Sequence, residues 1–451
     1  MPAGSRPHKR VLALTSTRTR FYIGSVKWRN QLLALFCLIA FFAFGVFYFR
    51  YWVIQKPFGI ILFIGEGLDS QTLAEARIRA GGMEKPLALD SLAYTALLKN
   101  YSADSPVPDP AAAATALATG SKVPNGMIAM DAAEHSLPNL LDLARDAGRM
   151  TGLITNGHVT NPTAACFYAH STSPDNWQDF ADQLVKTGDL DLVLGAGAAD
   201  FLPSSLGGRR SDERDLLTAA RKAGYDYIRT LAELEEVPRW RRAKLLGLFS
   251  NGDLAFGDEL EALDQPTLSD MVRRGIELLQ YHRGGYLLVV DGRLMRTARQ
   301  HEDPERRLAE AVEFDRAVSV ALQYTGNKST IFVCSDVVDS EPASAPPDPN
   351  SSPSAVPAPE ASIPPAAESS SPTESPVDST MSATSTAETP TADAGVSAGV
   401  PATRPDKEVM PHSSAAPSAE DVVAFGSGLG ADALHGTQDN TAIFAIIRDN
   451  L

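Results

Sequence analysis

Short apolar runs alternate with amphipathic segments along most of the chain. Five runs are short and largely apolar, which is typical of strands buried on both faces of a sheet. They span residues 59–65, 152–155, 190–195, 286–290 and 330–334. Four segments show helical periodicity: residues 137–147, 180–186, 268–279 and 306–322. The alternation predicts crossover units, and therefore an α/β fold with a mostly parallel central sheet flanked by helices on both faces.

A longer apolar run, residues 32–49, contains no charged side chain. At about 1.5 Å per residue, its length is close to the hydrocarbon thickness of a bilayer. Residues 1–50 carry eight Lys or Arg and no Asp or Glu, and the positive-inside rule places such a flank in the cytoplasm. We therefore predict a basic cytoplasmic segment over 1–30, a single-pass signal anchor over 31–54 and an extracytoplasmic main domain. A cleaved signal peptide and a buried core helix are the alternatives.

Residues 341–420 differ in composition from the rest of the chain. They hold 16 of the 31 prolines and no Phe, Tyr or Trp. Such a segment buries too little apolar surface to offset the entropy lost on ordering. We predict a disordered, acidic insert over 341–420 in one α/β domain formed by 55–340 and 421–451. Residues 421–426 are its final strand and 441–447 a closing helix.

Charge and cysteine content narrow the class of protein. The formal net charge is −15, which argues against a general nucleic-acid binder. Three cysteines permit one disulfide at most, so a disulfide-rich scaffold is excluded. Cys166 and Cys334 lie in or beside strand-like segments; we expect buried thiols, with a bridge as the alternative.

Acidic residues stand at the ends of three predicted strands: Glu66, Asp291 and Asp336. The carboxyl ends of parallel strands share one edge of a sheet, where α/β proteins place their chemistry. Each residue alone is more often a helix cap or a turn residue. Together, the three carboxylates favour a metal or phosphate site.

Seven stretches, taken in order, resemble the alkaline phosphatases. They are residues 61–67, 109–120, 159–170, 192–197, 246–249, 313–318 and 424–426. The resemblance covers nearly all of 57–340 and 421–451, and it implies that family's fold and a homodimer. Family members are phosphomonoesterases that use two zinc ions, a magnesium ion, a serine nucleophile and a phosphate-clamping arginine.

The nucleophile and the clamp are replaced at the positions that the resemblance assigns. The serine belongs at the start of a helix that this sequence signals well, with Asp109 as N-cap, Pro110 first and Gly120 at the end. The nucleophile position is therefore Pro110, which has neither a hydroxyl nor an N–H. Pro174 stands at the clamp position, where no bidentate fork is available.

The zinc positions are also largely replaced. At the first zinc site, Arg296, Gln300 and Pro417 stand where an Asp and two His belong. The second site would use Glu66, Asp336, Val337 and Pro110. Zinc needs several converging deprotonated ligands, so we expect neither site to hold it.

The magnesium positions keep oxygen-bearing side chains. Glu66, Asn161, Thr163 and Asp291 occupy them, and this oxygen-rich set could hold Mg²⁺ or Ca²⁺ weakly. Asp336 supplies one more carboxylate beside them. The competing prediction, which we prefer, is that Arg296 replaces the cation among Glu66, Asp291 and Asp336.

The substitutions predict a membrane-anchored, extracytoplasmic pseudophosphatase that acts as a binding or assembly module. Its protein partner or ligand is not identified by the sequence, and a homodimer is expected from the resemblance alone. One alternative is an active phosphomonoester hydrolase in which Thr115, Thr119 or Ser121 supplies a hydroxyl. We expect Thr115 and Thr119 to bond the preceding helical turn instead. The other alternative is a structural protein of the envelope.

Overall fold

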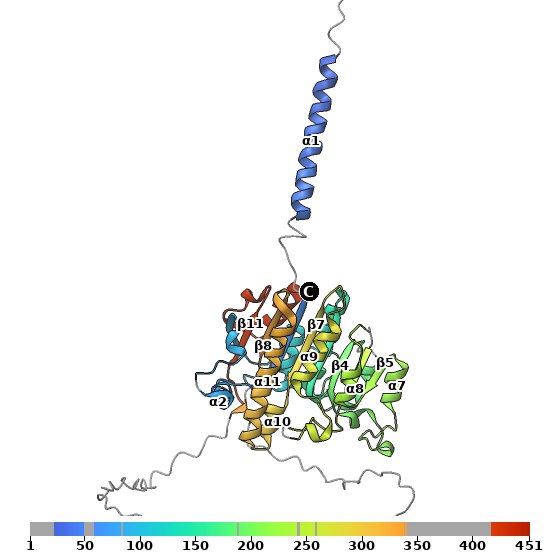
Figure 1. Ribbon diagram of the computed structural model, residues 1–451, viewed down its shortest axis with the longest axis vertical. Helices are drawn as coiled ribbons and strands as arrows, with labels where there is room; N and C mark the ends of the chain where they lie inside the picture. Colours follow the sequence, from blue (N-terminus) through green and yellow to red (C-terminus); the bar gives the residue numbers. More distant parts are fainter. Residues whose placement is uncertain are drawn as a thin grey trace, which may run out of the picture. The chain divides into compact units, whose positions relative to one another are not determined.

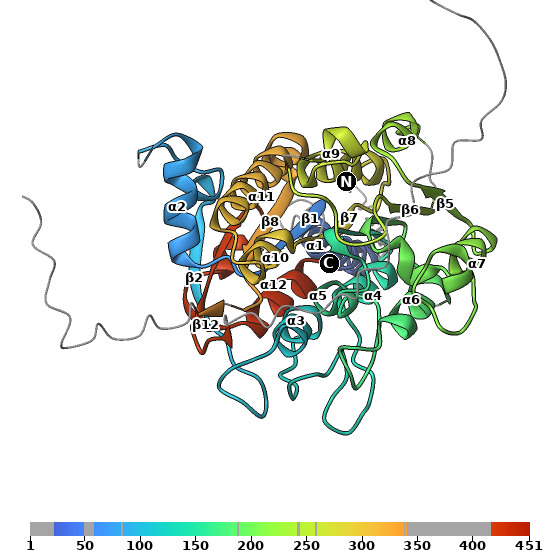
Figure 2. The same ribbon diagram turned by 90° about the horizontal axis from the view of Figure 1, so that it is seen from below.

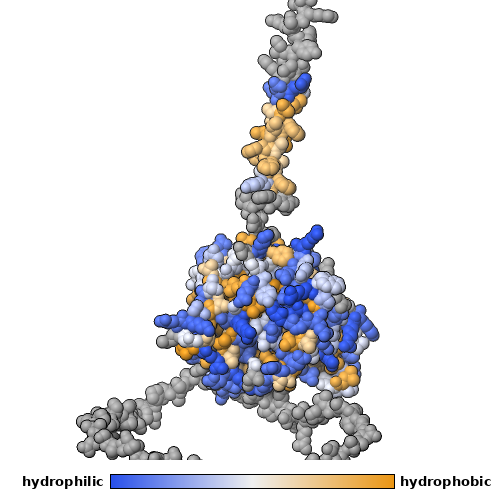
Figure 3. All heavy atoms as spheres, in the orientation of Figure 1, coloured by the Kyte–Doolittle hydropathy of each residue, from blue (hydrophilic) through white to orange (hydrophobic). Residues whose placement is uncertain are grey.

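The structure, a computed structural model, describes residues 22–48, 58–82, 84–186, 189–240, 244–257, 259–337, 339–340 and 416–451. The first helix, α1 (Tyr22–Tyr48), contains one candidate membrane span, Trp28–Tyr48, with a mean hydropathy of 2.3. Figure 3 contrasts the nearly continuous hydrophobic surface of this helix with the mostly hydrophilic surface of the α/β body. Length and composition therefore support the predicted anchor, whereas its orientation stays a prediction.

Ten strands of the described chain form one sheet (Figure 1). In spatial order they are β12 (Gly436–Asp439), β2 (Tyr94–Lys99), β11 (Val422–Ser427), β8 (Ser329–Cys334), β1 (Gly59–Gly65), β7 (Tyr286–Gly292), β3 (Met150–His158), β4 (Leu192–Ala196), β6 (Lys244–Leu248) and β5 (Tyr225–Ile228). Every pairing is parallel except those that β11 makes with β2 and β8. The predicted mostly parallel sheet is confirmed.

Helices cover both faces of the sheet, as Figure 2 shows from the end of the strands. One face packs on α2 (Ser70–Gly81), α8 (Leu231–Glu236), α9 (Leu268–Leu279), α10 (Leu294–Gln300) and α11 (Pro304–Thr325). The other packs on α3 (Pro110–Thr119), α4 (Leu140–Asp146), α5 (Pro162–Ala165), α6 (Trp177–Lys186), α7 (Leu216–Lys222) and α12 (Thr441–Asn450). β1 and β7 are buried along their whole length because both their faces meet these cores.

The helix that carries Pro110 forms as its sequence predicts. In α3 the Asp109 side chain accepts a hydrogen bond from Ala112 N, and Pro110 occupies the first turn. Gly120 ends the helix at φ 70°, a left-handed conformation that glycine adopts without strain. This helix lies against α12 and α5, so its amino end is fixed by packing as well as by its cap.

The structure also bears on the cysteines and the insert. Cys166 and Cys334 are free and buried, so the expected thiols are confirmed within the described chain.

Of the predicted insert, residues 341–415 lie outside the described residues. At its end, β10 (Ala416–Pro417) pairs antiparallel with β9 (Asp339–Ser340).

Candidate carboxylate–arginine site

The carboxyl edge of the sheet gathers the three predicted carboxylates. Glu66 follows β1, Asp291 is the penultimate residue of β7, and Asp336 lies two residues beyond β8. All three are at most 1 % exposed. These strands are neighbours in the sheet, so their parallel course brings the three side chains together.

Glu66 lies against an amide and two guanidinium groups. Asn161 Nδ2 donates to Glu66 Oε1 at 2.5 Å, and Arg293 Nη1 lies 3.2 Å from Glu66 Oε2. Arg296 Nη1 lies 3.9 Å from the same oxygen. Arg293 also donates to Asn161 Oδ1 at 3.1 Å, which closes a ring of three side chains. Glu66 is therefore compensated from within the chain.

Asp336 and Glu66 both lie near the guanidinium group of Arg296. Its Oδ2 lies 3.9 Å from Arg296 Nη1 and accepts a hydrogen bond from Thr163 Oγ1 at 3.3 Å. Arg296 thus bridges Glu66 and Asp336, the position that the internal-cation prediction gave it relative to those two carboxylates.

Asp291 is the least compensated of the three. Thr155 Oγ1 donates to its Oδ2 at 2.8 Å, whereas its Oδ1 has no hydrogen-bond partner among the described residues. Burial raises the pKa of this carboxyl well above its usual range, and the nearby Glu66 and Asp336 raise it further. A protonated Asp291 leaves two carboxylates facing two guanidinium groups.

Arg293 was missed by the sequence interpretation, although it directly follows β7, the strand that contains Asp291. Burial alone would lower its pKa, but the carboxylates of Glu66 and Asp253 outweigh burial and raise it. The signal was present: Arg293 directly follows Gly292, the last residue of β7, and therefore lies at the carboxyl edge. The resemblance assigned no role to this position, so the residue was overlooked.

The side chains at this edge differ from the ligands that the metals implied by the resemblance require. Both guanidinium groups carry only donors and a fixed positive charge, and they face Glu66 and Asp336. Within the described ranges, no cluster of three or more His, Cys, Asp or Glu has a metal-holding arrangement. This arrangement does not fit two zinc ions and a magnesium ion, because the cations would face two arginines.

The amino end of α3 is occupied by its own cap. Asp109 Oδ1 accepts from Ala112 N at 2.8 Å, and its Oδ2 accepts from Gly126 N at 2.7 Å. Pro174 is half-buried and lies beside Gly126. Gly126 therefore links the loop of Pro174 to the cap residue that precedes Pro110, and neither proline offers a side-chain donor.

The alternative hydroxyls lie elsewhere on α3. Thr119 Oγ1 donates to Thr115 O at 2.8 Å, as expected. The expectation for Thr115 was wrong: its Oγ1 donates to Met127 O and accepts from Ala129 N, both at 3.0 Å. The loop that follows α3 folds back over the helix and provides these partners. Ser121 lies beyond the carboxyl end of α3.

A second chain of charged groups continues from Arg293 along the same edge. Arg293 Nε lies 3.7 Å from Asp253 Oδ2, and Asp253 Oδ1 accepts from His158 N at 3.0 Å. His158 Nδ1 lies 2.9 Å from Asp200 Oδ2, and Asp200 also accepts from Arg209. Burial would raise the pKa of Asp200, but the hydrogen bonds from His158 and Arg209 hold it below its usual range.

Comparisons with known proteins agree with this arrangement of elements. The family described as Alkaline phosphatase matches residues 59–451. The tissue-nonspecific alkaline phosphatases of Gallus gallus and Homo sapiens are 30 % and 28 % identical over 321 and 323 residues. These alignments cover 61 % of this chain in both cases, and 62 % and 61 % of the relatives. The chain therefore spans about three fifths of their length.

Solved structures show the same fold. The alkaline phosphatase from the Antarctic bacterium TAB5 superposes with a TM-score of 0.63 at 18 % identity, covering 88 % of this chain and 98 % of that one. The Thermus thermophilus alkaline phosphatase gives a TM-score of 0.57 at 28 % identity over 63 % and 60 % of the two chains. With the family matched over residues 59–451, this chain belongs to the alkaline phosphatase family.

Proposed function

We propose that this protein is a catalytically impaired alkaline phosphatase, anchored by α1 in a membrane and acting as a binding or assembly module outside the cytoplasm. One observation carries the proposal: Arg293 and Arg296 lie against the buried Glu66, at 3.2 and 3.9 Å. A carboxylate in the family's metal site is here neutralised by the chain itself. The fold then has no need of a divalent cation at this edge.

The chemistry of ester hydrolysis supports the same conclusion. Phosphate-monoester hydrolysis is among the slowest uncatalysed reactions, so an enzyme needs a nucleophile, a Lewis acid and charge stabilisation together. Pro110 supplies no nucleophile, and Pro174 supplies no fork for the phosphate oxygens. Asp109 places a carboxylate at the amino end of α3, which repels an approaching phosphate.

The membrane anchor is supported by the residues at the two ends of the candidate span in α1. The candidate span begins at Trp28 and ends at Tyr48, two residue types that favour the membrane interface. Seven of the eight Lys and Arg in residues 1–50 precede the apolar run, and Arg50 follows it. This asymmetry favours a cytoplasmic amino terminus and an α/β domain on the opposite side.

A hydrolysis assay with the full chain tests the impairment. The protein is purified in detergent, supplied with Zn²⁺ and Mg²⁺, and assayed with para-nitrophenyl phosphate while bound metal is quantified. We expect no turnover above buffer and no stoichiometric zinc. Turnover that Glu66→Ala abolishes and Glu305→Ala preserves would establish an active hydrolase, since the Glu305 side chain is 80 % exposed and pairs with Arg79 of α2.

A separate measurement tests the binding role. We expect the full chain, isolated from its native membrane, to retain one stoichiometric partner. A preparation that retains none favours the purely structural alternative. The homodimer, which only the resemblance suggests, is tested on the same material by its mass in detergent.

A further inference from the structure

Nine strands of the sheet run in one direction, and β11 alone among the ten strands of this described sheet runs opposite to them. Their first residues therefore lie along one edge, opposite Glu66, which we call the amino edge. Phe58, directly before β1, is held there because its carbonyl accepts from Tyr286 N at 3.0 Å and from Arg149 Nη1 at 3.1 Å. The chain that follows α1 therefore enters the α/β domain at the amino edge.

Exposed aromatic side chains precede three of these strands. Trp240 is 78 % exposed and lies before β6; Tyr281 is 61 % exposed and lies before β7. Tyr324 is 41 % exposed and lies near the end of α11, before β8. Large aromatic groups with a polar edge are costly in bulk water and favourable at the boundary between lipid and water.

The turns that carry or adjoin these residues are basic. The described turns at 221–224, 237–240, 280–285 and 325–328 hold five Lys or Arg and no Asp or Glu, whereas Asp189 and Asp191 precede β4 on the same edge. They are Arg221, Lys222, Arg239, Arg283 and Lys328. Residues 51–340 and 421–451 together carry a net charge of −14, so this concentration of cations runs against the charge of the domain.

The length of the connection keeps the amino edge close to α1. Nine residues separate Tyr48, the end of α1, from Phe58. A fully extended chain spans at most about 3.3–3.6 Å per residue, so this connection reaches about 35 Å. Such a short tether maintains a high local concentration of the amino edge at whatever surface α1 enters.

We propose that the amino edge docks on the bilayer that α1 spans, with Trp240, Tyr281 and Tyr324 at the interface and the basic turns on anionic phospholipid headgroups. Aromatic rings and the aliphatic stems of Arg and Lys enter the headgroup layer, while the charges meet lipid phosphates. This inference rests on the anchoring role of α1. Docking holds the domain upright and turns the carboxylate–arginine site away from the membrane.

Trp240 provides the measurement. The full chain is reconstituted in phosphatidylcholine vesicles, with or without phosphatidylglycerol, that contain a lipid with a spin-labelled headgroup as quencher. The emission lost in Trp240→Phe isolates this residue from Trp28, Trp52 and Trp177. We expect the Trp240 emission to be quenched, and more strongly with phosphatidylglycerol present.

Charge variants sharpen the test. Arg283→Glu and Lys328→Glu should each lower the ratio of docked to undocked domain about fivefold or more. Arg316→Glu, the same change at a 71 % exposed side chain of α11, should leave it unchanged. The inference is overturned if Trp240 is unquenched in both lipids, if all three variants behave alike, or if Trp240 is shielded only in a complex of two copies.

One control separates this inference from the proposed function. Alkaline carbonate extraction reports whether α1 is integral to the membrane. A chain that resists extraction while Trp240 stays unquenched refutes docking and leaves the anchor intact. A chain that is extracted refutes the anchor itself, and docking with it.

Discussion

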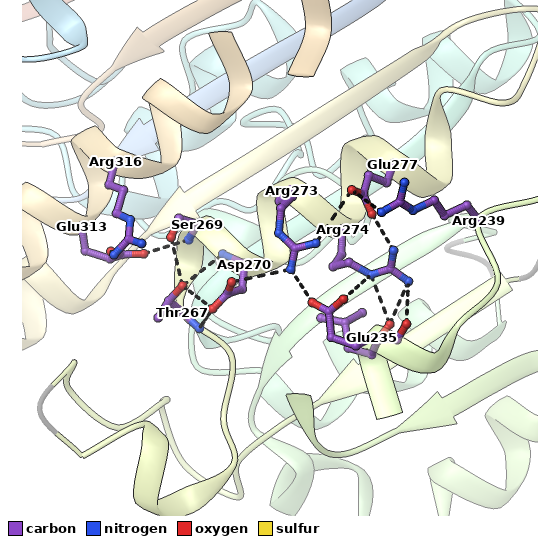
Figure 4. A network of polar contacts seen from close by, with 11 residues as sticks. Glu235, Arg239, Thr267, Ser269, Asp270, Arg273, Arg274, Glu277, Glu313 and Arg316 are labelled. Atoms are coloured by element: carbon purple, nitrogen blue, oxygen red, sulfur yellow. Dashed lines mark hydrogen bonds and ion pairs between the residues drawn. The ribbon is translucent and has the colours of Figure 1, made fainter. Parts of the chain in front are cut away.

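Two buried networks of charged side chains in this protein differ in how completely their polar atoms are paired. Arg274 and Glu277 both lie on α9, where it packs against α8, and their side chains are 2 % and 4 % exposed. Arg274 Nη1 lies 2.6 Å from Glu277 Oε2 (Figure 4). Arg274 Nη2 also donates to the carbonyls of Leu234 at 3.0 Å and Val237 at 2.7 Å. None of the buried polar atoms of this network lacks a partner in the described chain.

The carboxylate–arginine site lacks that completeness. Its guanidinium–carboxylate distances are 3.2 to 3.9 Å, and Asp291 Oδ1 has no partner among the described groups. Three carboxylates meet two arginines there. The comparison teaches that the α8–α9 network fixes two helices to each other. At the edge site, in contrast, the charges lie farther apart and one carboxylate oxygen has no hydrogen-bond partner among the described residues.

The largest effect is expected in the complete network. Arg274→Ala leaves the buried Glu277 with Arg239 and Arg273 as its ion-pair partners. The substitution also removes the donor to three carbonyls at the end of α8. Removing one partner of a buried pair typically costs about 3–5 kcal/mol. Urea denaturation of the full chain measures the loss. Arg239→Ala, at a 57 % exposed partner of Glu277, should cost under about 1 kcal/mol. Equal losses in the two variants would contradict the comparison.

An intermediate effect, reversible by metal, is expected at the edge. Arg293→Ala leaves Glu66 and Asp253 undercompensated and should cost about 2–4 kcal/mol, since the Arg293 side chain is 24 % exposed. Added Mg²⁺ should restore much of the loss, because a ligand at a hundred times its Kd contributes about 2.7 kcal/mol. Thermal denaturation with and without Mg²⁺ measures both effects. Rescue of Arg274→Ala by Mg²⁺ as well would mean that the metal acts nonspecifically.

The smallest effect concerns pH. The folded-state pKa of Asp291 is raised, so this carboxyl binds a proton more tightly in the folded chain than in the unfolded one. Its contribution to stability is complete below the unfolded pKa of about 3.9 and is lost as pH rises through the folded pKa. Asp291→Asn should flatten this fall in the free energy of unfolding, measured from acid to neutral pH. A variant that keeps the slope of the original chain would show that Asp291 is ionised when folded.

Much of the fold could be predicted because its central elements are fully buried. The runs at 59–65 and 268–279 form β1 and α9 with the predicted bounds. A strand buried on both faces leaves a continuous apolar run in the sequence, and a helix packed on a sheet leaves a helical period. β2 and β5 were not predicted. β2 has one face exposed and a mixed pattern, and β5 is only four residues long, so neither leaves a continuous apolar signal.

The three carboxylates and Arg296 were named from the sequence, whereas Arg293 and Asp253 were not. Glu66, Asp291 and Asp336 follow strands, and strand order alone brings them together. Arg293 was overlooked although it directly follows β7, because the resemblance assigned no role to its position. Asp253 lies in a loop, where a charged residue is usually solvated, and nothing in the local sequence shows that it contacts Arg293. The partners of Thr115 were missed for a related reason: they come from a loop whose path depends on tertiary packing.

The direction of β1 has a consequence for reach. The eight steps from Phe58 to Glu66, at about 3.3 Å each, make this strand a rigid spacer of about 26 Å between these two residues. With the amino edge docked on the bilayer as proposed, the opposite edge of the sheet would face the aqueous side. A soluble partner that binds there would need no affinity for lipid of its own.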